Sequence, residues 1–302
     1  MTPPEAQRPR LPLERWGRAW FERVRAHADR RAVTRYGFEF LMFGLKQGWA
    51  CLFGALMLSL LLGTALVWPA GAPVARYDFI VVAAVLIQAA MLALKLESWD
   101  EAKVILAFHV VGTIMEIFKT HVGSWIYPEP SFLRIGGVPL FSGFMYACVG
   151  SYIARIWRIF DIRFSHYPPL WTTWALAAGI YINFFSHHWV WDARWLLFAA
   201  TALLFWRSVF WFKPDRIYRP MPVLLGFGLV ALFIWLAVNV GTFSRAWLYP
   251  SQRGGWHLVD PSKLGAWFLL MIISVVLVSL VQRPRGRDGE LLGVRRRFVT
   301  PG

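Results

Sequence analysis

The chain has 302 residues, of which 57% are hydrophobic and 16% are charged, whereas a soluble domain carries about a quarter charged residues. This composition excludes an ordinary soluble domain and predicts a protein embedded in a membrane. The formal net charge of +15 would suggest nucleic acid on a soluble surface, but the basic residues stand mainly at the ends of apolar segments, as membrane orientation requires. We therefore expect no nucleic-acid partner.

The N-terminal segment contains no continuous apolar core and no small-residue cleavage site, so the sequence predicts no signal peptide. Its apolar residues recur at three- and four-residue spacing with arginines between them, which predicts a basic amphipathic helix over 11–33 on the inner leaflet. A plain solvated tail is the alternative. The apolar residues are Leu13, Trp16, Trp20, Val24 and Ala28. We assign residues 1–36 to this cytoplasmic or interfacial segment, 37–283 to a transmembrane bundle and 284–302 to a basic cytoplasmic tail.

Apolar runs of about 20 residues, long enough to span a bilayer, predict an all-α polytopic transmembrane helix bundle. The predicted spans are 44–68, 77–95, 104–121, 139–159, 169–187, 194–212, 221–243 and 264–282. Eight spans place both termini on one side. With that side cytoplasmic, 25 of the 32 lysines and arginines lie on it, in keeping with the positive-inside rule. We expect a multi-pass protein of the bacterial inner membrane that contacts membrane lipids; its oligomeric state stays open.

Two outer loops carry the same short motif. Residues 124–128 read Ser-Trp-Ile-Tyr-Pro after the third span, and residues 246–250 read Ala-Trp-Leu-Tyr-Pro after the seventh, each followed by a pair of glycines. A parallel duplication of a four-helix unit would produce this spacing. The helices themselves do not align well, so interfacial aromatic residues used twice by chance are the alternative.

The third span carries polar residues at three- and four-residue intervals, which places them on one helix face. They are His109, Gly112, Thr113, Glu116 and Thr120. Ionisable groups at membrane depth mark a functional site by default because they are costly there. His109 and Glu116 are two turns apart, roughly 10 Å, so each needs a partner from another helix or a water molecule.

Other polar residues are expected at the same outer level, on the fifth span, its following turn, and the fourth and seventh spans. From these we take Glu116, His109, His187 and Asn183 as candidate catalytic residues. The candidate substrate-binding residues are Thr113, Lys119, Tyr127, Tyr146, His188, Asp192 and Asn239. The alternative for each is a hydrogen bond that only holds helices together. At the inner end, Arg155, Arg158 and Arg207 are expected to reach the headgroups with their long side chains.

The sequence identifies no cofactor. It contains no H-x-x-x-H or H-E-x-x-H spacing on one helix, so we expect no metal site, although ligands assembled from distant segments remain open. Neither nucleotide-binding glycine motif is present. Cys51 and Cys148 both lie in apolar stretches, which argues against a disulfide framework or a cysteine metal site.

The residues H-V-V-G-T-x-x-E-I-F-K-T-x-x-G-S-W-x-Y-P-E-P (109–130) and G-V-P-L-F-S-G-F-M-Y (137–146) resemble an uncharacterised bacterial integral-membrane family, the YoaT-like proteins. Segments 246–252 and 263–279 fit the same family, so the likeness covers nearly the whole chain. It implies a membrane location and no mechanism.

A shorter stretch is similar to membrane carotenoid-modifying proteins of the hydratase type. The corresponding residues are Glu116, Gly123, Tyr127 and Gly137-Val138-Pro139. This resemblance implies acid-base chemistry on an apolar substrate.

We therefore favour a membrane-embedded enzyme or binding protein for a lipid or isoprenoid-like molecule. In this reading Glu116 delivers a proton, and His109 or His187 accepts one or positions water. A proton- or cation-coupled transporter is the main alternative, and a scaffold or assembly factor is a third. A transporter should be polar in both halves of the membrane, whereas this sequence concentrates its polar residues at the outer end.

Overall fold

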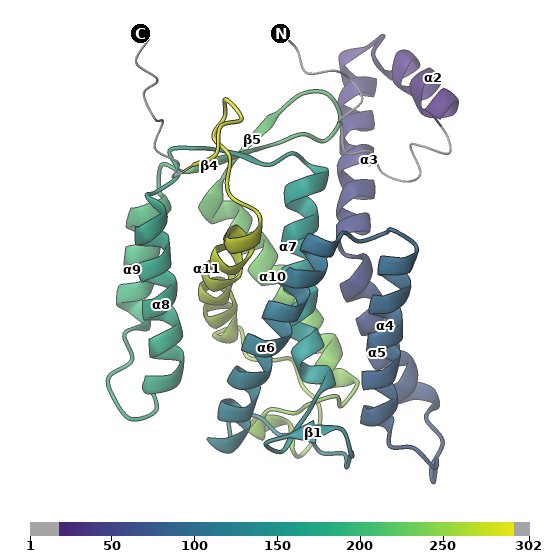
Figure 1. The fold of residues 1–302 in the computed structure, drawn as a ribbon, viewed down its shortest axis with the longest axis vertical. Coiled ribbons are helices and arrows are strands. Elements are labelled where there is room, and N and C mark those ends of the chain that lie inside the picture. The colour runs from purple at the N-terminus through teal and green to yellow at the C-terminus, as the bar shows by residue number, and fades with distance from the viewer. Residues whose placement is uncertain (1–17, 293–302) are drawn as a thin grey trace, which may run out of the picture.

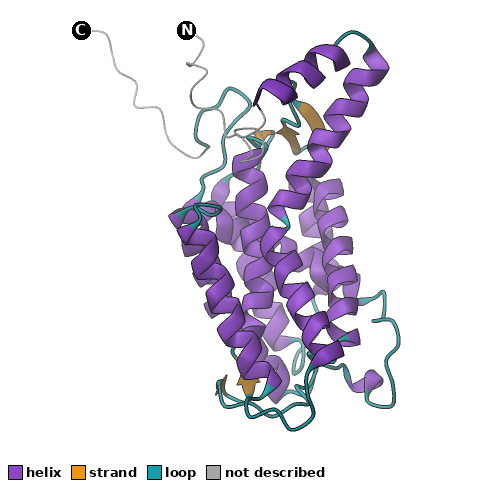
Figure 2. Ribbon diagram, turned by 90° about the vertical axis from the view of Figure 1, so that its right-hand side faces the viewer, coloured by secondary structure: helices purple, strands orange, loops and turns teal. Residues whose placement is uncertain are grey.

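The computed structural model describes residues 18–292, and most of them are helical. The helices lie side by side and run between two ends of the molecule (Figures 1 and 2). One end, the sheet end, carries α2 and a three-stranded sheet; the other, the loop end, carries a two-stranded sheet and the longest loops. The helices are α2 (Arg18–Ala28), α3 (Ala32–Ala50), α4 (Leu52–Val67), α5 (Arg76–Ala93), α6 (Trp99–His121), α7 (Phe141–Ile159), α8 (Leu170–Ser186), α9 (Arg194–Phe205), α10 (Val223–Phe243) and α11 (Lys263–Val281).

Three of these helices, α5, α10 and α11, are individually long and apolar enough to cross a membrane. Helices α3 and α4 meet the same test together and are bent by 60° where they join. The predicted span 44–68 therefore differs from the structure, because the helix begins at Ala32 and breaks at Cys51. Gly48 and Gly54 flank the break, and glycine weakens helical structure on both sides of it.

The predicted span 194–212 is only partly helical. Helix α9 ends at Phe205, and the chain continues into β4 (Val209–Phe212), which pairs with β3 (Arg163–Ser165) and β5 (Arg219–Pro222). The Val-Phe-Trp-Phe sequence of β4 suits a strand as well as an apolar helix. Neighbouring strands from distant segments decide between the two. At the loop end, β1 (Arg134–Ile135) pairs with β2 (Val138–Pro139).

Much of the outer surface of the helices is apolar. Helix α10 exposes Leu225, Leu232 and Leu236 by 43–52%. Exposed tryptophans lie near the beginning of α8 and in the turn between α8 and α9, namely Trp171, Trp174, Trp189 and Trp191. An apolar band with tryptophans at its edges suits contact with lipid chains and headgroups.

Helices α6 and α7 approach closely because small residues lie between them. A Cβ atom added to Gly112 would meet the Tyr146 ring at 2.6 Å, and one added to Gly150 would meet the Phe108 ring at 2.6 Å. A Cβ atom on Gly143 would meet His109 at 2.5 Å. This packing lays the ring of Tyr146 across α6.

The sheet end contains buried ion pairs that correct one prediction. Arg155 does not reach outward, because its side chain is fully buried and its Nη2 lies 3.0 Å from Oε1 of Glu97. Arg158 is 42% exposed and pairs with Glu101 at 2.9 Å. Glu101 also forms a capping box with Ser98 that starts α6 at Trp99, five residues before the predicted span.

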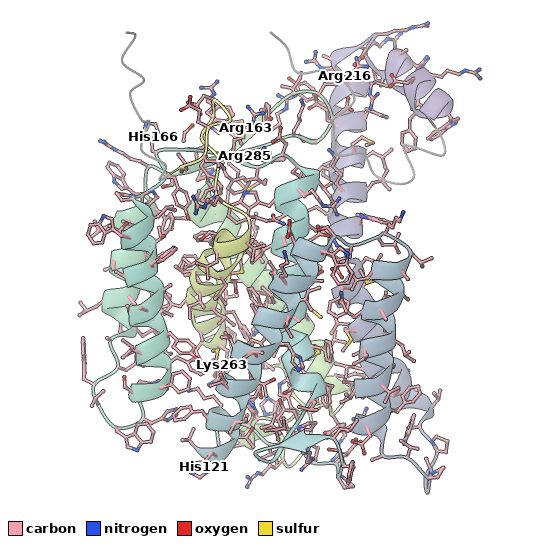
Figure 3. The ribbon with its side chains drawn as sticks, in the orientation of Figure 1. His121, Arg163, His166, Arg216, Lys263 and Arg285 are labelled. Atoms are coloured by element: carbon pink, nitrogen blue, oxygen red, sulfur yellow. The ribbon has the colours of Figure 1, made fainter. Side chains whose placement is uncertain are left out.

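Helix α2 occupies part of the predicted amphipathic segment, while Leu13 and Trp16 lie outside the described residues. Ala28 is buried against α3, whereas Trp20 is 61% exposed. Arg25 holds α2 to the loop between β4 and β5 through an ion pair of 2.7 Å with Asp215. Basic residues gather at this end: Arg163, Arg216 and Arg285 lie there in Figure 3, whereas His121 lies at the loop end.

Candidate functional site

The two Trp-x-Tyr-Pro motifs follow helices that end in the same way. Gly123 after α6 and Arg245 after α10 both adopt a positive φ, of 72° and 57°. The next residue in each case donates its backbone N–H to a carbonyl five residues earlier, Ser124 to Lys119 at 2.9 Å and Ala246 to Gly241 at 3.1 Å. This is the arrangement of a Schellman helix end. Local backbone structure is therefore repeated together with the sequence.

The motifs also pair with each other. Ile126 and Leu248 form an antiparallel bridge, with N–H···O distances of 2.9 and 3.0 Å in the two directions. Side chains alternate in such a pair, and directly opposed residues share a face. The bridge therefore sends four aromatic side chains to the other face, those of Trp125, Tyr127, Trp247 and Tyr249, and all four line one cavity.

Glu116 on α6 accepts hydrogen bonds from three aromatic side chains in this region. Trp125 Nε1 donates to Oε2 at 2.6 Å, and the Tyr127 hydroxyl donates to the same oxygen at 2.5 Å. The Tyr146 hydroxyl on α7 donates to Oε1 at 2.8 Å. Glu116 is 5% exposed. Burial disfavours the ionised form of this carboxyl group, whereas the three donors around it favour that form.

Two of the tyrosines lie outside the helices, in the paired motifs. Burial, with the nearby charge of Glu116, raises the pKa of Tyr127 well above its usual range. The same two causes raise the pKa of Tyr249. Both phenols therefore keep their protons at physiological pH, and Tyr127 remains a donor.

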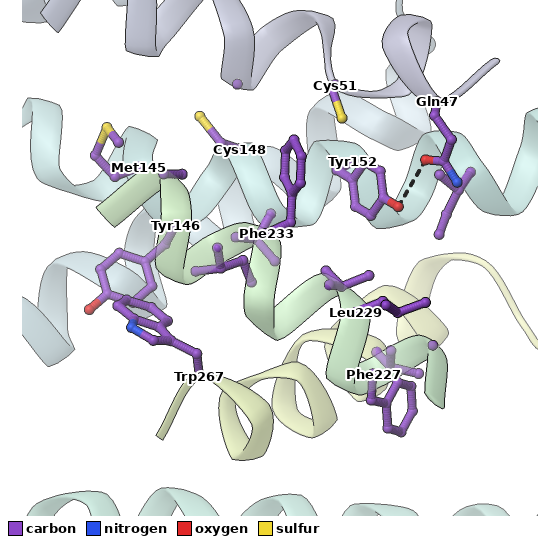
Figure 4. Close-up of a pocket in the computed structure, with 18 of the residues that line it drawn as sticks. Gln47, Cys51, Met145, Tyr146, Cys148, Tyr152, Phe227, Leu229, Phe233 and Trp267 are labelled. Carbon is purple, nitrogen blue, oxygen red and sulfur yellow. Dashed lines mark hydrogen bonds between the residues drawn. The ribbon is translucent and has the colours of Figure 1, made fainter. Parts of the chain in front are cut away.

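The cavity has a volume of about 650 Å³ and runs between α7 and α10. Glu116 and the aromatic side chains lie toward the loop end, and the cavity extends along α7 to Gln47 and Cys51 at the break between α3 and α4. Figure 4 shows Tyr146 and Trp267 toward one end of this space and Gln47, hydrogen-bonded to Tyr152, toward the other. The wall between the ends is mostly aliphatic and aromatic, for example Met145, Leu229 and Phe233.

Glu116 differs from the other buried carboxylates that the structure describes. Glu39, Glu97 and Glu101 each form an ion pair with an arginine, at 2.5, 3.0 and 2.9 Å. Glu116 has no ion pair among residues 18–292. Among the described residues that line the cavity, there is no lysine, arginine or histidine. The cavity wall therefore carries one carboxyl group and no basic side chain.

His109 and Thr113 lie away from the cavity that Glu116 lines. His109 packs its ring against Phe144, 4.5 Å between centroids, and its Nδ1 is buried without a hydrogen bond from the described residues. Thr113 donates its hydroxyl to the carbonyl of His109 at 2.7 Å, as a side chain does within one helix. Both residues lie on the α6 surface that faces Gly143, and neither lines the cavity. The three- and four-residue spacing that places His109 and Glu116 on one face of α6 does not decide which of the two side chains lines the cavity.

A second group of predicted residues meets at the end of α8, away from Glu116. Asn183 donates to Asp192 at 3.0 Å and accepts from the backbone of Ala193 at 2.9 Å. His187 Nδ1 lies 2.8 Å from the carbonyl of Asn183, and His188 Nε2 lies 2.9 Å from Nζ of Lys119. None of these five side chains lines the cavity. The structure therefore does not bring Asn183 and His187 to the cavity with Glu116.

Electrostatics in this turn follow from its contacts. Burial and the positive charges of Lys119 and His187 lower the pKa of His188. Burial alone would raise the pKa of Asp192, but hydrogen bonds from Asn183 and from the backbone of Arg194 hold it below its usual range. The group fixes the turn between α8 and α9 to the end of α6.

Asn239 also has a structural environment. Its amide nitrogen donates to the carbonyl of Trp235 at 2.8 Å, and its oxygen accepts from the backbone of Val259 at 2.8 Å. The amide oxygen thus ties residues 244–262 to α10, while the amide nitrogen bonds within α10. Asn239 does not line the cavity.

Of the predicted residues, Glu116, Tyr127 and Tyr146 come together at the cavity. Sequence reasoning missed Trp125, Trp247, Tyr249 and Trp267, which line it as well. The repeated Trp-x-Tyr-Pro motif is the sequence signal that marks Trp125, Trp247 and Tyr249. Among the described residues, no group of three or more histidine, cysteine, aspartate or glutamate side chains could hold a metal ion.

Comparison with known proteins gives kinship without an activity. A family described as protein of unknown function (DUF817) matches residues 39–275. The chain is 40% identical over 245 residues to the uncharacterised protein YoaT of Bacillus subtilis (strain 168). The matched region covers 81% of this chain and 92% of that protein. No solved structure matches. The predicted YoaT-like kinship is confirmed.

Proposed function

The chain belongs to the DUF817 family of unknown function, and we propose that it is a membrane protein that binds a lipid or isoprenoid-like molecule in the cavity between α7 and α10. In this proposal the bundle crosses the bacterial inner membrane eight times, with α3 and α4 as one bent crossing and each of α5 to α11 as another. The sheet end faces the cytoplasm, since basic residues gather there.

The observation that carries the proposal is the wall of the cavity. It has a polar group at one end, Glu116 with its tyrosine and tryptophan donors, and an apolar wall along most of the remaining length. Such a division fits an elongated molecule with one polar end and one apolar chain. The volume of about 650 Å³ is within the range of ligand-binding sites.

The acid-base roles of His109 and His187 are not part of the proposal, because both side chains lie away from the cavity. Glu116 stays as the polar terminus of the binding site. A proton- or cation-coupled transporter has less support, because its path should be polar along its length. In this cavity the segment between Tyr146 and Tyr152 is lined by Cys148 and Val149.

Gly48 offers a test at the end of the cavity remote from Glu116. It lines the cavity, and an added Cβ atom would meet no atom within 4 Å. Gly48→Leu should therefore fold, and its side chain should shorten the space for an apolar chain. Gly63→Leu is the matched control, because Gly63 is also helical with open space at its Cβ and does not line the cavity.

Native mass spectrometry can measure retention of hexadecanol and dodecanol by the purified protein in a neutral detergent. We expect the natural protein and Gly63→Leu to retain hexadecanol, and Gly48→Leu to retain dodecanol in preference to it. If neither alcohol is retained, or if the two variants have the same profile as the natural protein, the apolar chain does not occupy this cavity.

A further inference from the structure

The unpaired carboxyl group of Glu116 implies the charge of the ligand. An ionised carboxylate in an apolar interior is unfavourable unless hydrogen bonds and an opposite charge compensate for the lost hydration. The three donors supply the hydrogen bonds. Arginines supply the opposite charge for Glu39, Glu97 and Glu101. At Glu116 a cationic ligand would supply the opposite charge.

The aromatic side chains around Glu116 suit the same ligand. Trp125, Tyr127, Trp247 and Tyr249 face the cavity from the paired motifs, and Tyr146 and Trp267 face it from α7 and α11. Trp125 and Tyr249 stand edge to face with centroids 6.2 Å apart, which forms a corner and not a flat stack. The faces of tryptophan and tyrosine rings attract organic cations, and cages of such rings recognise alkylated ammonium groups.

The same wall disfavours a phosphate group. Phosphate binding in proteins uses lysine, arginine or backbone N–H groups at helix N-termini. The described cavity wall has no lysine or arginine. A zwitterionic phospholipid would bring its phosphate next to Glu116 without a partner.

We propose that the loop end of the cavity is an aromatic cage for a singly charged alkylammonium group, with Glu116 as its counter-ion. This inference rests on the proposed function, since the apolar chain attached to the ammonium group would occupy the remaining cavity. It adds the class of ligand: a phosphate-free cationic amphiphile with one apolar chain. The repeated Trp-x-Tyr-Pro motifs then have one shared purpose, because each contributes two rings to the cage.

The test compares three probes that share one chain length and differ in their head: hexadecyltrimethylammonium, hexadecanol and palmitoyl lysophosphatidylcholine. Retention by the purified full chain is measured by native mass spectrometry in a neutral detergent. We expect hexadecyltrimethylammonium to be retained at least about tenfold more tightly than hexadecanol, as one ion pair in a dry site with cation–π contacts would give. Lysophosphatidylcholine should be retained no better than hexadecanol.

Glu116→Gln removes the charge and keeps the size of the side chain, so it should abolish the preference for the ammonium probe over hexadecanol. The matched control is Asp100→Asn on the same helix, since Asp100 is 63% exposed and pairs with Lys103. If Glu116→Gln does not fold, Tyr249→Leu provides the second variant, with an expected loss of about threefold for the ammonium probe alone.

The outcomes separate the two proposals. Equal retention of ammonium and alcohol by the natural protein, or a preference that survives in Glu116→Gln, would overturn the ammonium cage and leave the apolar binding site standing. Tighter retention of lysophosphatidylcholine would show that a phospholipid headgroup is the ligand and would also overturn the cage as proposed. Failure to retain any of the three probes would overturn the binding function itself.

Discussion

Breaking the buried ion pair between Glu97 and Arg155 should destabilise the protein strongly. Both side chains have no exposed surface, and the carboxylate also accepts from Ser151 at 3.1 Å and from Gln88. Glu97→Gln keeps the shape of the side chain but leaves the guanidinium of Arg155 buried without an opposite charge. Removing one partner of a buried pair costs about 3–5 kcal/mol.

Arg155 has few other contacts that could replace the ion pair. Its Nη1 donates to the carbonyl of Trp49 at 3.2 Å, and its Nε has no hydrogen-bond partner among the described residues. One neutral acceptor does not compensate for a buried charge. We therefore expect Tm to fall on the order of 10 °C in Glu97→Gln, at about 2–4 °C per kcal/mol.

The double variant Glu97→Gln with Arg155→Met removes both charges and should recover at least half of the lost Tm, because an apolar replacement of a buried pair is often tolerated. The assay is thermal unfolding of the purified protein in one detergent, followed by intrinsic fluorescence. The matched control is Asp100→Asn, an exposed pair with an expected change within about 0.5 kcal/mol. A loss in Glu97→Gln no larger than in the control would refute the reasoning.

Two further predictions concern contacts of α6. The pKa of His188 is lowered by burial and by Lys119, so this side chain binds fewer protons in the folded protein than in the unfolded chain. Thermal stability should therefore fall as pH decreases through and below about 6.5. The decrease should be smaller in His188→Gln. A pH profile of Tm identical in the two proteins would contradict this. Gly112→Ala places a Cβ atom 2.6 Å from the Tyr146 ring, which should cost about 1–3 kcal/mol and weaken retention of the ammonium probe by displacing a donor of Glu116. Unchanged stability and retention would show that the ring adjusts freely.

The sequence by itself determined the helical content and the approximate limits of most apolar helices. Predicted spans 139–159, 221–243 and 264–282 agree with α7, α10 and α11 to within two residues at each end. Long apolar runs with polar or proline residues at their ends have few alternatives, because the backbone must satisfy its own hydrogen bonds within the segment. The same local reasoning marked Glu116 and detected the two Trp-x-Tyr-Pro motifs.

Only the tertiary structure decided which polar residues meet. Glu116 accepts hydrogen bonds from aromatic donors and not from His109 or His187. Helical periodicity places residues only on a broad face, and the close packing of α7 against α6 at glycines selects which neighbours meet. Arg155 is buried because Glu97 from another segment lies beside it. The strand β4 exists because β3 and β5 are there to pair with it.

The repeated motif shows the division most directly. The residues alone indicate that two loops share aromatic side chains suited to an interface. The bridge between Ile126 and Leu248 turns both sets of rings to one side and brings them to the carboxyl group of Glu116. Pairing between segments more than a hundred residues apart depends on how α6 and α10 are placed in the bundle, and no local pattern encodes that placement.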